Sequence, residues 1–262
     1  MATRKKVKRI LNCVPSHHQE KDWRFEHALA AHKGKLARAI PNTKDLREPW
    51  WKIGDQGSTG SCVGWASADA VLRWHFVKAK KIDPATSLSV RFQWMASNEI
   101  DEFGSTATTF LEDAGTSIKA ALDIARKFGA VEDSVLPFNG SLSKLDERVF
   151  YARAARLKIA SYYNLMGSNK LENFRQWIAA QGPIIATLNC DRSWYDIARN
   201  GKLEQYGKAS PEDGHAISIV GYTKDYFIVR NSWGTQWGDK GFAYATNAYV
   251  QAAINEAYGI LV

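Results

Sequence analysis

Cys62, His215 and Asn231 have the residue types and settings that could form a nucleophile, a base and an orienting group. Cys62 ends the glycine-rich run Asp55-Gln-Gly-Ser-Thr-Gly-Ser-Cys and opens a helical pattern. At a helix start, the macrodipole and the free backbone N–H groups favour an anion, which lowers the pKa of a thiol. The same N–H groups can stabilise an oxyanion on a bound acyl group. Cys62 is therefore predicted to be a nucleophile for acyl transfer.

Histidine is the natural general base near neutral pH. Four of the six histidines lie within the first 39 residues, which leaves His75 and His215. His75 lies 13 residues beyond Cys62 on the same predicted helix, about 20 Å away at the rise of an α-helix. We therefore interpret His75 as a helix-surface or core residue and His215 as the base.

Asn231 is the predicted partner of His215. Residues 216–222 and 226–230 have strand composition and are separated by a short turn at 223–225. An antiparallel hairpin would place the start of the first strand beside the end of the second. The amide oxygen of Asn231 could then accept the ring N–H of His215 and leave the other ring nitrogen facing a thiol.

The other two cysteines fit a nucleophile less well. Cys190 follows an apolar strand pattern, where a buried structural thiol is common, and Cys13 has no glycine turn near it. Three cysteines cannot all pair within one chain, so we expect no disulfide framework and a reducing compartment. The Cys/His spacing is unlike that of zinc sites, and we predict neither a metal nor a cofactor.

Helices precede strands along the chain, which predicts an α+β protein of two lobes. Helical periodicity begins after Gly60, with Ser61 as the expected N-cap, and recurs over 117–128 and 170–180. Strand patterns follow at 184–188, 216–222, 226–230 and 241–245. We expect a helix-rich lobe over 40–150 and a β-rich lobe over 151–262.

Residues 1–39 form a basic N-terminal arm. The chain carries a formal net charge of +8, and the arm holds ten Lys/Arg and three Asp/Glu, so the body is close to neutral. Apolar runs are much shorter than the ~20 residues of a membrane helix. The N-terminus lacks the apolar stretch of a signal peptide. We expect a cytoplasmic protein or one exported by another route.

Three blocks of the sequence resemble those of papain-family cysteine peptidases, particularly bacterial members. They are the run ending at Cys62, Gly214-His-Ala-Ile-Ser-Ile-Val-Gly-Tyr222, and Asn231-Ser-Trp-Gly-Thr-Gln-Trp-Gly-Asp-Lys-Gly-Phe242. The order Cys, His, Asn also agrees, and weaker similarity covers roughly residues 40–250. The resemblance implies a papain-like two-lobed fold, with a helical lobe, a β-barrel-like lobe and the active-site cleft between them.

The resemblance also implies roles for further residues. Gln56 would donate a side-chain N–H to the oxyanion, and Trp233 would cover the contact of His215 with Asn231. By matching positions, Gly115 would pair with the backbone of a substrate. The remaining matched positions would shape the pocket for the side chain that precedes the one at the scissile bond; these are Ile118, Thr187 and Gly214.

This sequence departs from the family pattern at three places. Thr59 stands where many secreted members have a half-cystine. Val63-Gly64-Trp65 replaces the usual tryptophan directly after the cysteine, which changes the packing behind Cys62. A single glycine, Gly115, stands where a pair is usual.

The predicted function is that of a cysteine endopeptidase acting on a protein or peptide through a thioester. Two alternatives stay open: an amidase or transamidase with the same residues, and a non-catalytic binding protein with a papain-like body. For the arm, the alternatives are a short pro-segment of a zymogen, a permanent part of the fold and a disordered tail. Its basic head, residues 4–9, is also a weaker candidate for contact with nucleic acid or an anionic membrane. We expect a monomer.

Overall fold

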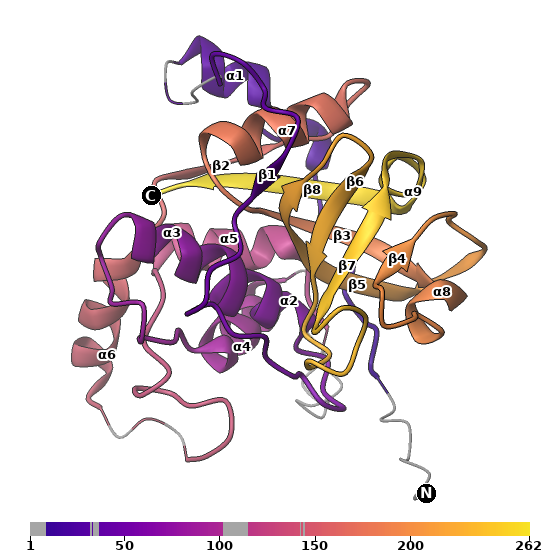
Figure 1. The fold of residues 1–262 in the computed structure, drawn as a ribbon. Helices are drawn as coiled ribbons and strands as arrows, with labels where there is room; N and C mark the ends of the chain where they lie inside the picture. Colours follow the sequence, from indigo (N-terminus) through magenta and orange to yellow (C-terminus); the bar gives the residue numbers. More distant parts are fainter. Residues whose placement is uncertain (1–8, 32, 34–36, 102–114, 142, 144) are drawn as a thin grey trace, which may run out of the picture.

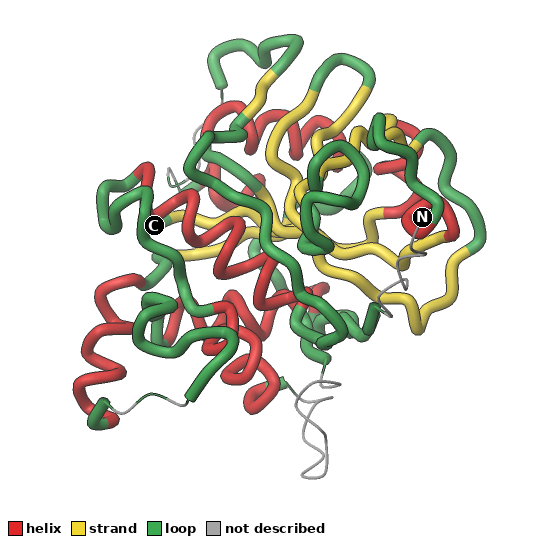
Figure 2. Tube along the Cα trace, turned by 60° about the horizontal axis from the view of Figure 1, so that its bottom comes forward, coloured by secondary structure: helices red, strands yellow, loops and turns green. Residues whose placement is uncertain are grey.

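One side of the molecule is built mainly of helices, and the other contains most of the strands together with a few helices, as Figures 1 and 2 show. The computed structural model describes residues 9–31, 33, 37–101, 115–141, 143 and 145–262. The helical side is built around one continuous helix, which begins as α2 (Cys62–Gly64), widens to a π-helical stretch over Trp65–Leu72 and ends as α3 (Arg73–Lys78). Helices α4 (Val90–Ile100) and α5 (Ile118–Lys127) pack against it, and α6 (Glu147–Ala154) packs on α4 through Phe150 and Phe92.

The strands form one sheet that follows the order β2-β8-β3-β5-β6-β7-β4, with β1 (Lys44–Asp45) paired to β5 at one side. Its long central strands are β3 (Ile184–Asp191), β5 (Ala209–Tyr222) and β8 (Ile254–Leu261). The remaining strands are β2 (Ser161–Asn164), β4 (Lys202–Leu203), β6 (Tyr226–Arg230) and β7 (Phe242–Thr246). Neighbours pair antiparallel except β4 and β7, which are parallel.

Three short helices and the N-terminal arm complete the β-rich side. Helix α7 (Lys170–Ala180), α8 (Arg192–Tyr195) and α9 (Asn247–Ala253) connect strands. The arm carries helix α1 (Phe25–Ala30), which lies beside α7 at the top of Figure 1. Phe25 of α1 packs edge-on against Trp177 of α7, with ring centroids 5.5 Å apart. The arm therefore shares the core of the β-rich side.

Two large hydrophobic clusters match the two sides. One is formed mainly by the sheet with α7 and α9 and contains Phe174, Trp177, Trp194 and Phe227. The other lies between the helices and the sheet, and it contains Cys62, Ile118, Leu122 and Tyr258. The second cluster includes Cys13 of the arm. Burial of apolar surface at about 25 cal/mol per Å² is the main stabilising contribution to such clusters.

The expected helices and strands are all present, and the predicted α+β class is confirmed. The predicted hairpin joins β5 to β6, with Ser218 opposite Arg230. Helix α4 and strand β8 were missed. The expected lobe boundary after residue 150 falls within α6, so that division stays a prediction. Within the described residues, the helices are too short or too polar to span a membrane.

Candidate active site

Cys62 is the first residue of the long central helix and is fully buried. Its position allows the dipole and the backbone N–H groups of the first turn to act on the thiol. Ser61 precedes the helix, as expected, but its hydroxyl lies 2.6 Å from the Thr59 hydroxyl. That contact replaces the expected hydrogen bond of an N-cap.

Gly64 explains the unusual residues after Cys62. A Cβ at Gly64 would lie 2.7 Å from the carbonyl oxygen of Val90 and 2.9 Å from Cβ of Trp94, both on α4. The nucleophile helix therefore approaches α4 more closely than a side chain would permit. Trp65 lies two positions beyond the usual tryptophan and packs on Phe138, with ring centroids 5.2 Å apart.

His215 and Asn231 are joined by a hydrogen bond across the β5–β6 hairpin. Nε2 of His215 lies 2.8 Å from Oδ1 of Asn231, and the same Oδ1 accepts the backbone N–H of Ser232 at 2.8 Å. Because this atom accepts a backbone N–H, it is the oxygen of the Asn231 amide and not its nitrogen. An amide oxygen can only accept, so Nε2 of His215 carries the proton of the bond between them. Nδ1 is then the ring nitrogen left for the thiol of Cys62, with which the imidazole interacts.

Aromatic rings enclose this contact. The ring centroid of Trp233 lies 5.0 Å from that of His215, and the ring of Trp194 lies 5.6 Å away on another side. Trp194 is in turn held by Trp237, whose ring stacks on it at 5.0 Å. Trp233 was expected from the sequence, whereas Trp194 was not, because α8 brings it to the site only in the folded chain.

Gln56 is buried and held by several hydrogen bonds. Its Oε1 accepts the hydroxyl of Ser232 at 2.8 Å, and its Nε2 donates to the carbonyl of Thr59 at 3.0 Å. The backbone N–H of Gln56 donates to the carbonyl of Ser232 at 2.8 Å. The amide group thus points its N–H toward the cleft, where the carbonyl oxygen of Ile10 lies 3.5 Å from Nε2.

The arm runs through the cleft between the two sides. The backbone N–H of Cys13 donates to the carbonyl of Gly214 at 3.0 Å, and that of Val14 donates to the carbonyl of Thr116 at 3.3 Å. A Cβ at Gly115 would lie 1.9 Å from the carbonyl oxygen of Asn12, and one at Gly214 would lie 2.0 Å from that of Cys13. Both glycines therefore permit a close approach of another backbone.

The side chains of Cys13 and Cys62 lie in the same buried cluster, and the two thiols interact. This interaction, followed by that with the imidazole of His215, holds the pKa of Cys62 well below its usual range against the effect of burial. The same interaction, together with burial, raises the pKa of Cys13 well above its usual range. Cys13 therefore keeps its thiol proton, and Cys62 has thiolate character.

Arg9 anchors the start of the described arm. Its guanidinium donates to the carboxylate of Asp55 at 2.5 Å, to the carbonyl of Gly57 at 2.9 Å and to the carbonyl of Trp233 at 3.1 Å. It also lies 5.6 Å from the ring centroid of Trp233. Arg9 therefore binds the elements that carry Gln56 and Asn231.

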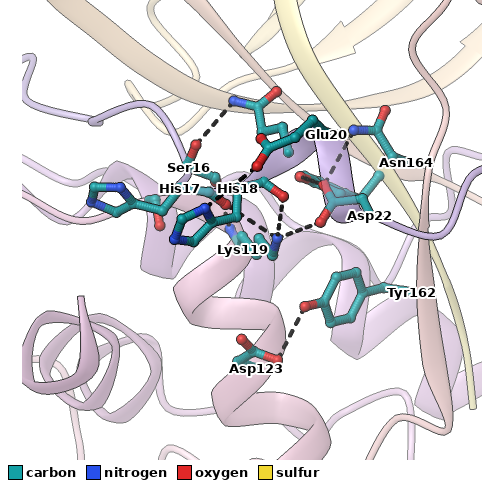
Figure 3. A network of polar contacts seen from close by, with 12 residues as sticks. Ser16, His17, His18, Glu20, Asp22, Lys119, Asp123, Tyr162 and Asn164 are labelled. Carbon is teal, nitrogen blue, oxygen red and sulfur yellow. Dashed lines mark hydrogen bonds and ion pairs between the residues drawn. The ribbon is translucent and has the colours of Figure 1, made fainter. Parts of the chain in front are cut away.

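A second set of polar contacts, shown in Figure 3, anchors the arm to α5 and to the sheet. Lys119 of α5 forms an ion pair with Asp22, whose side chain is only 4% exposed, and donates to the carbonyl of His17 at 3.1 Å. Asp22 also accepts hydrogen bonds from Tyr258 at 2.5 Å and from Asn164 at 3.3 Å. The arm is thus fixed at Arg9 and at Asp22, before and after the stretch that passes between the two sides.

The expected pocket residues lie along this passage. Ile118 begins α5 and is fully buried. Thr187 of β3 lies opposite Ala216 on one side and Glu256 of β8 on the other. Glu256 was not predicted: it is buried, burial raises its pKa, and its Oε2 accepts the backbone N–H of Ser16 at 3.2 Å. Across the described residues, His, Cys, Asp and Glu form no group that could hold a metal ion.

Several known proteins are similar to this chain. The chain is similar to a cysteine protease of Blomia tropicalis, with 24% identity over 83% of this chain and 64% of that protein. It is similar to cathepsin S of Mus musculus, with 25% identity over 78% of this chain and 58% of that protein. The chain thus spans about three fifths of the length of these curated relatives.

Solved structures show the same fold. Xylellain, a cysteine protease from Xylella fastidiosa, superposes with a TM-score of 0.76 and 19% identity over 100% of this chain and 99% of that chain. Digestive procathepsin L 3 of Tenebrio molitor larval midgut superposes with a TM-score of 0.69 and 17% identity over 97% and 77%. The profile of the papain family cysteine proteases matches residues 40–260. With this match over most of its length, the chain belongs to the papain family of cysteine proteases.

Proposed function

We propose that this chain is a cysteine endopeptidase that hydrolyses peptide bonds through a thioester acyl-enzyme. The observation that carries the proposal is the buried series in which Cys62 interacts with His215 and His215 bonds to Asn231 at 2.8 Å. Cys62 is the nucleophile, His215 the base and Asn231 the residue that orients the base. The family membership supports the same assignment.

The proposed reaction begins with attack of the Cys62 thiolate on a peptide carbonyl. The backbone N–H of Cys62 and the side-chain N–H of Gln56 stabilise the oxyanion. His215, which as an imidazolium is paired with the Cys62 thiolate, gives its proton to the leaving amine. Water then attacks the thioester with His215 as base, which releases the acid and restores the thiolate. Asn231 keeps the ring oriented throughout, and the Trp194 and Trp233 rings exclude water from that contact.

The arm is proposed to be an inhibitory pro-segment of a zymogen. Its N–H groups at Cys13 and Val14 use the carbonyls of Gly214 and Thr116, which are the backbone groups that line the cleft beside Cys62. A substrate needs the same groups, so the arm has to leave before a substrate binds. The ion pair of Lys119 with Asp22 and the bonds of Arg9 favour the closed state.

The partner that we propose is therefore a protein or peptide, with the chain acting as a monomer. Residues 4–8 of the basic head lie outside the described residues. Arg9, the last residue of that head, is engaged by Asp55 and Trp233, which favours a role in holding the arm over contact with nucleic acid or a membrane. Elution at the mass of one chain in size-exclusion chromatography would agree with a monomer.

The test is an intact-mass time course of the full chain at mildly acidic and neutral pH, with a fluorogenic peptide assay in parallel. We expect loss of an N-terminal fragment that ends near residue 39 and a rise in peptide cleavage. Cys62→Ala should show neither, whereas Cys190→Ala, which removes another buried thiol, should behave as wild type. A Cys62→Ala chain that cleaves peptides at the wild-type rate would exclude the proposal.

Two further measurements separate the alternatives. Product analysis in the presence of added amines distinguishes hydrolysis from transamidation, because both share the acylation step. Labelling of Cys62 by an epoxide inhibitor of this family distinguishes an enzyme from a binding protein, because only an activated thiolate reacts at an appreciable rate.

A further inference from the structure

We propose that Cys13 and Cys62 form a reversible dithiol–disulfide pair, in which a hydroperoxide oxidises Cys62 and Cys13 closes a disulfide that ties the arm into the cleft. Cys13 is then a resolving cysteine, and the pair is an oxidation site. The regulatory meaning of this pair rests on the peptidase function proposed above, but its formation does not.

Backbone contacts of the arm hold Cys13 in the buried cluster that also contains Cys62. The N–H of Cys13 bonds to the carbonyl of Gly214 at 3.0 Å, which positions the arm residue directly beside the residue that precedes His215. The close approach at Gly214 admits no side chain there. The Cys13 side chain lies in the same buried cluster as Cys62, and the two thiols interact.

Distant contacts keep Cys13 in register. Arg9, four residues before Cys13, donates to the carboxylate of Asp55. Val14, the residue after Cys13, donates its backbone N–H to the carbonyl of Thr116. Beyond them, Lys119 holds Asp22. A thiol held in this way has a high effective concentration at Cys62, which favours an intramolecular reaction over reaction with a thiol in solution.

The two thiols have unequal protonation, as an attacking and a resolving cysteine require. Cys62 has the lowered pKa and thiolate character, so it is the sulfur that reacts with a peroxide. Cys13 keeps its proton until the sulfenic acid has formed beside it. Cys190 offers a contrast in the same chain, since burial raises its pKa and it lies in the cluster of the sheet.

The chemistry balances with a hydroperoxide as oxidant. The Cys62 thiolate attacks a peroxide oxygen, the O–O bond breaks and hydroxide leaves, so that the sulfur is oxidised to sulfenic acid and the peroxide is reduced. The Cys13 sulfur then loses its proton and attacks the Cys62 sulfur. The S–O bond breaks, water leaves and the S–S bond forms. A small dithiol reverses the reaction by exchange and becomes a disulfide itself.

Two consequences follow for the site. The nucleophile is blocked covalently, and the arm, which is otherwise held by hydrogen bonds and ion pairs, cannot leave. Cys62 is also protected from further oxidation to sulfinic acid, which is irreversible under ordinary conditions. Cys13 retains 7% of its surface and Cys62 none, so the oxidant enters from the side of the arm.

The test uses the full chain treated with hydrogen peroxide, alkylated under denaturing conditions and digested with trypsin. Cleavage after Lys and Arg places Cys13 in the peptide Ile10–Lys21 and Cys62 in Ile53–Arg73. We expect these two peptides to be linked in wild type, with a combined mass lower by two hydrogen atoms, and to separate after dithiothreitol. The matched control Cys190→Ser should give the same linked pair.

Cys13→Ser should give no linked pair, and its Cys62 peptide should gain two or three oxygen atoms that dithiothreitol does not remove. Cys13→Ala serves as a second variant. Absence of the linked pair in wild type, with Cys62 over-oxidised as fast as in Cys13→Ser, would overturn the proposal. The mass readout is independent of peptidase activity. A chain that forms the link but never cleaves a peptide would contradict the proposed function alone, and an active chain without the link would contradict this inference alone.

Discussion

Asp69 and Arg230 form a buried ion pair at 2.7 Å that joins the helix of Cys62 to strand β6, which ends at Arg230. Asp69 lies about two turns beyond Cys62 on the helix, and Arg230 directly precedes Asn231. Arg230 also donates to the carbonyl of Lys52 at 2.5 Å. The pair therefore links the two halves of the candidate active site through residues that no catalytic motif includes.

Asp69→Asn should lower the free energy of unfolding by about 3–5 kcal/mol, because it leaves the Arg230 guanidinium buried without its counter-charge. Asp45→Asn is the matched control, since Asp45 pairs with Arg47 at the same 2.7 Å but with side chains 45% and 32% exposed. Loss of such an exposed pair should cost less than about 1 kcal/mol. Urea unfolding measures both, and equal losses would contradict the role assigned to the buried pair.

Lys119→Met should release the arm and increase peptide cleavage by the full chain. The substitution removes the cation that pairs with Asp22 and donates to the carbonyls of His17 and His18. Lys127→Met is the control, because Lys127 is an exposed residue of the same helix. The rate of Cys62 alkylation by iodoacetamide reports the opening of the cleft directly. Unchanged alkylation in Lys119→Met would show that this anchor does not hold the arm.

His75 should make the protein less stable as the pH falls below neutral. Burial lowers the pKa of His75 from 6.5 to about 4, so between these values the unfolded chain binds the proton and the folded chain does not. Stability that is present above pH 6.5 is therefore lost as the pH falls toward 4, by about 2 kcal/mol between pH 6.5 and pH 5. His75→Gln should remove this part of the pH dependence in urea unfolding. An identical pH dependence in the variant would contradict the burial effect.

Cys13→Ala should raise the pKa of Cys62 in the arm-bearing chain. The interaction with Cys13 is the largest influence that lowers it, and that with His215 is the next. With His215 alone, the thiolate should still form below the usual range of a cysteine but at a higher pH than in wild type. The pH dependence of alkylation, or thiolate absorbance in the ultraviolet, measures the shift. A lower pKa in the variant would mean that Cys13 opposes the thiolate.

The fold was predictable where the sequence pattern is local and strong. The β5–β6 hairpin follows from two apolar runs separated by a short turn, and α5 follows from its apolar face and its start at Ser117, whose hydroxyl accepts the N–H of Ala120. Strand β8 was missed because Asn255 and Glu256 interrupt its apolar run. Its place is decided by pairing with β2 and β3, which are distant in the sequence.

The sequence alone determined Cys62, His215 and Asn231 as the candidate catalytic residues, because each lies in a short motif whose residue types and local structure already specify its chemistry. Only the tertiary structure decided the place of Cys13, which has no glycine turn near it and fits a nucleophile less well than Cys62 does. Its contact with Cys62 depends on backbone bonds from the arm to Gly214 and Thr116. Backbone groups look alike at every residue, so a pairing between segments far apart in the chain leaves little trace in the sequence of either one.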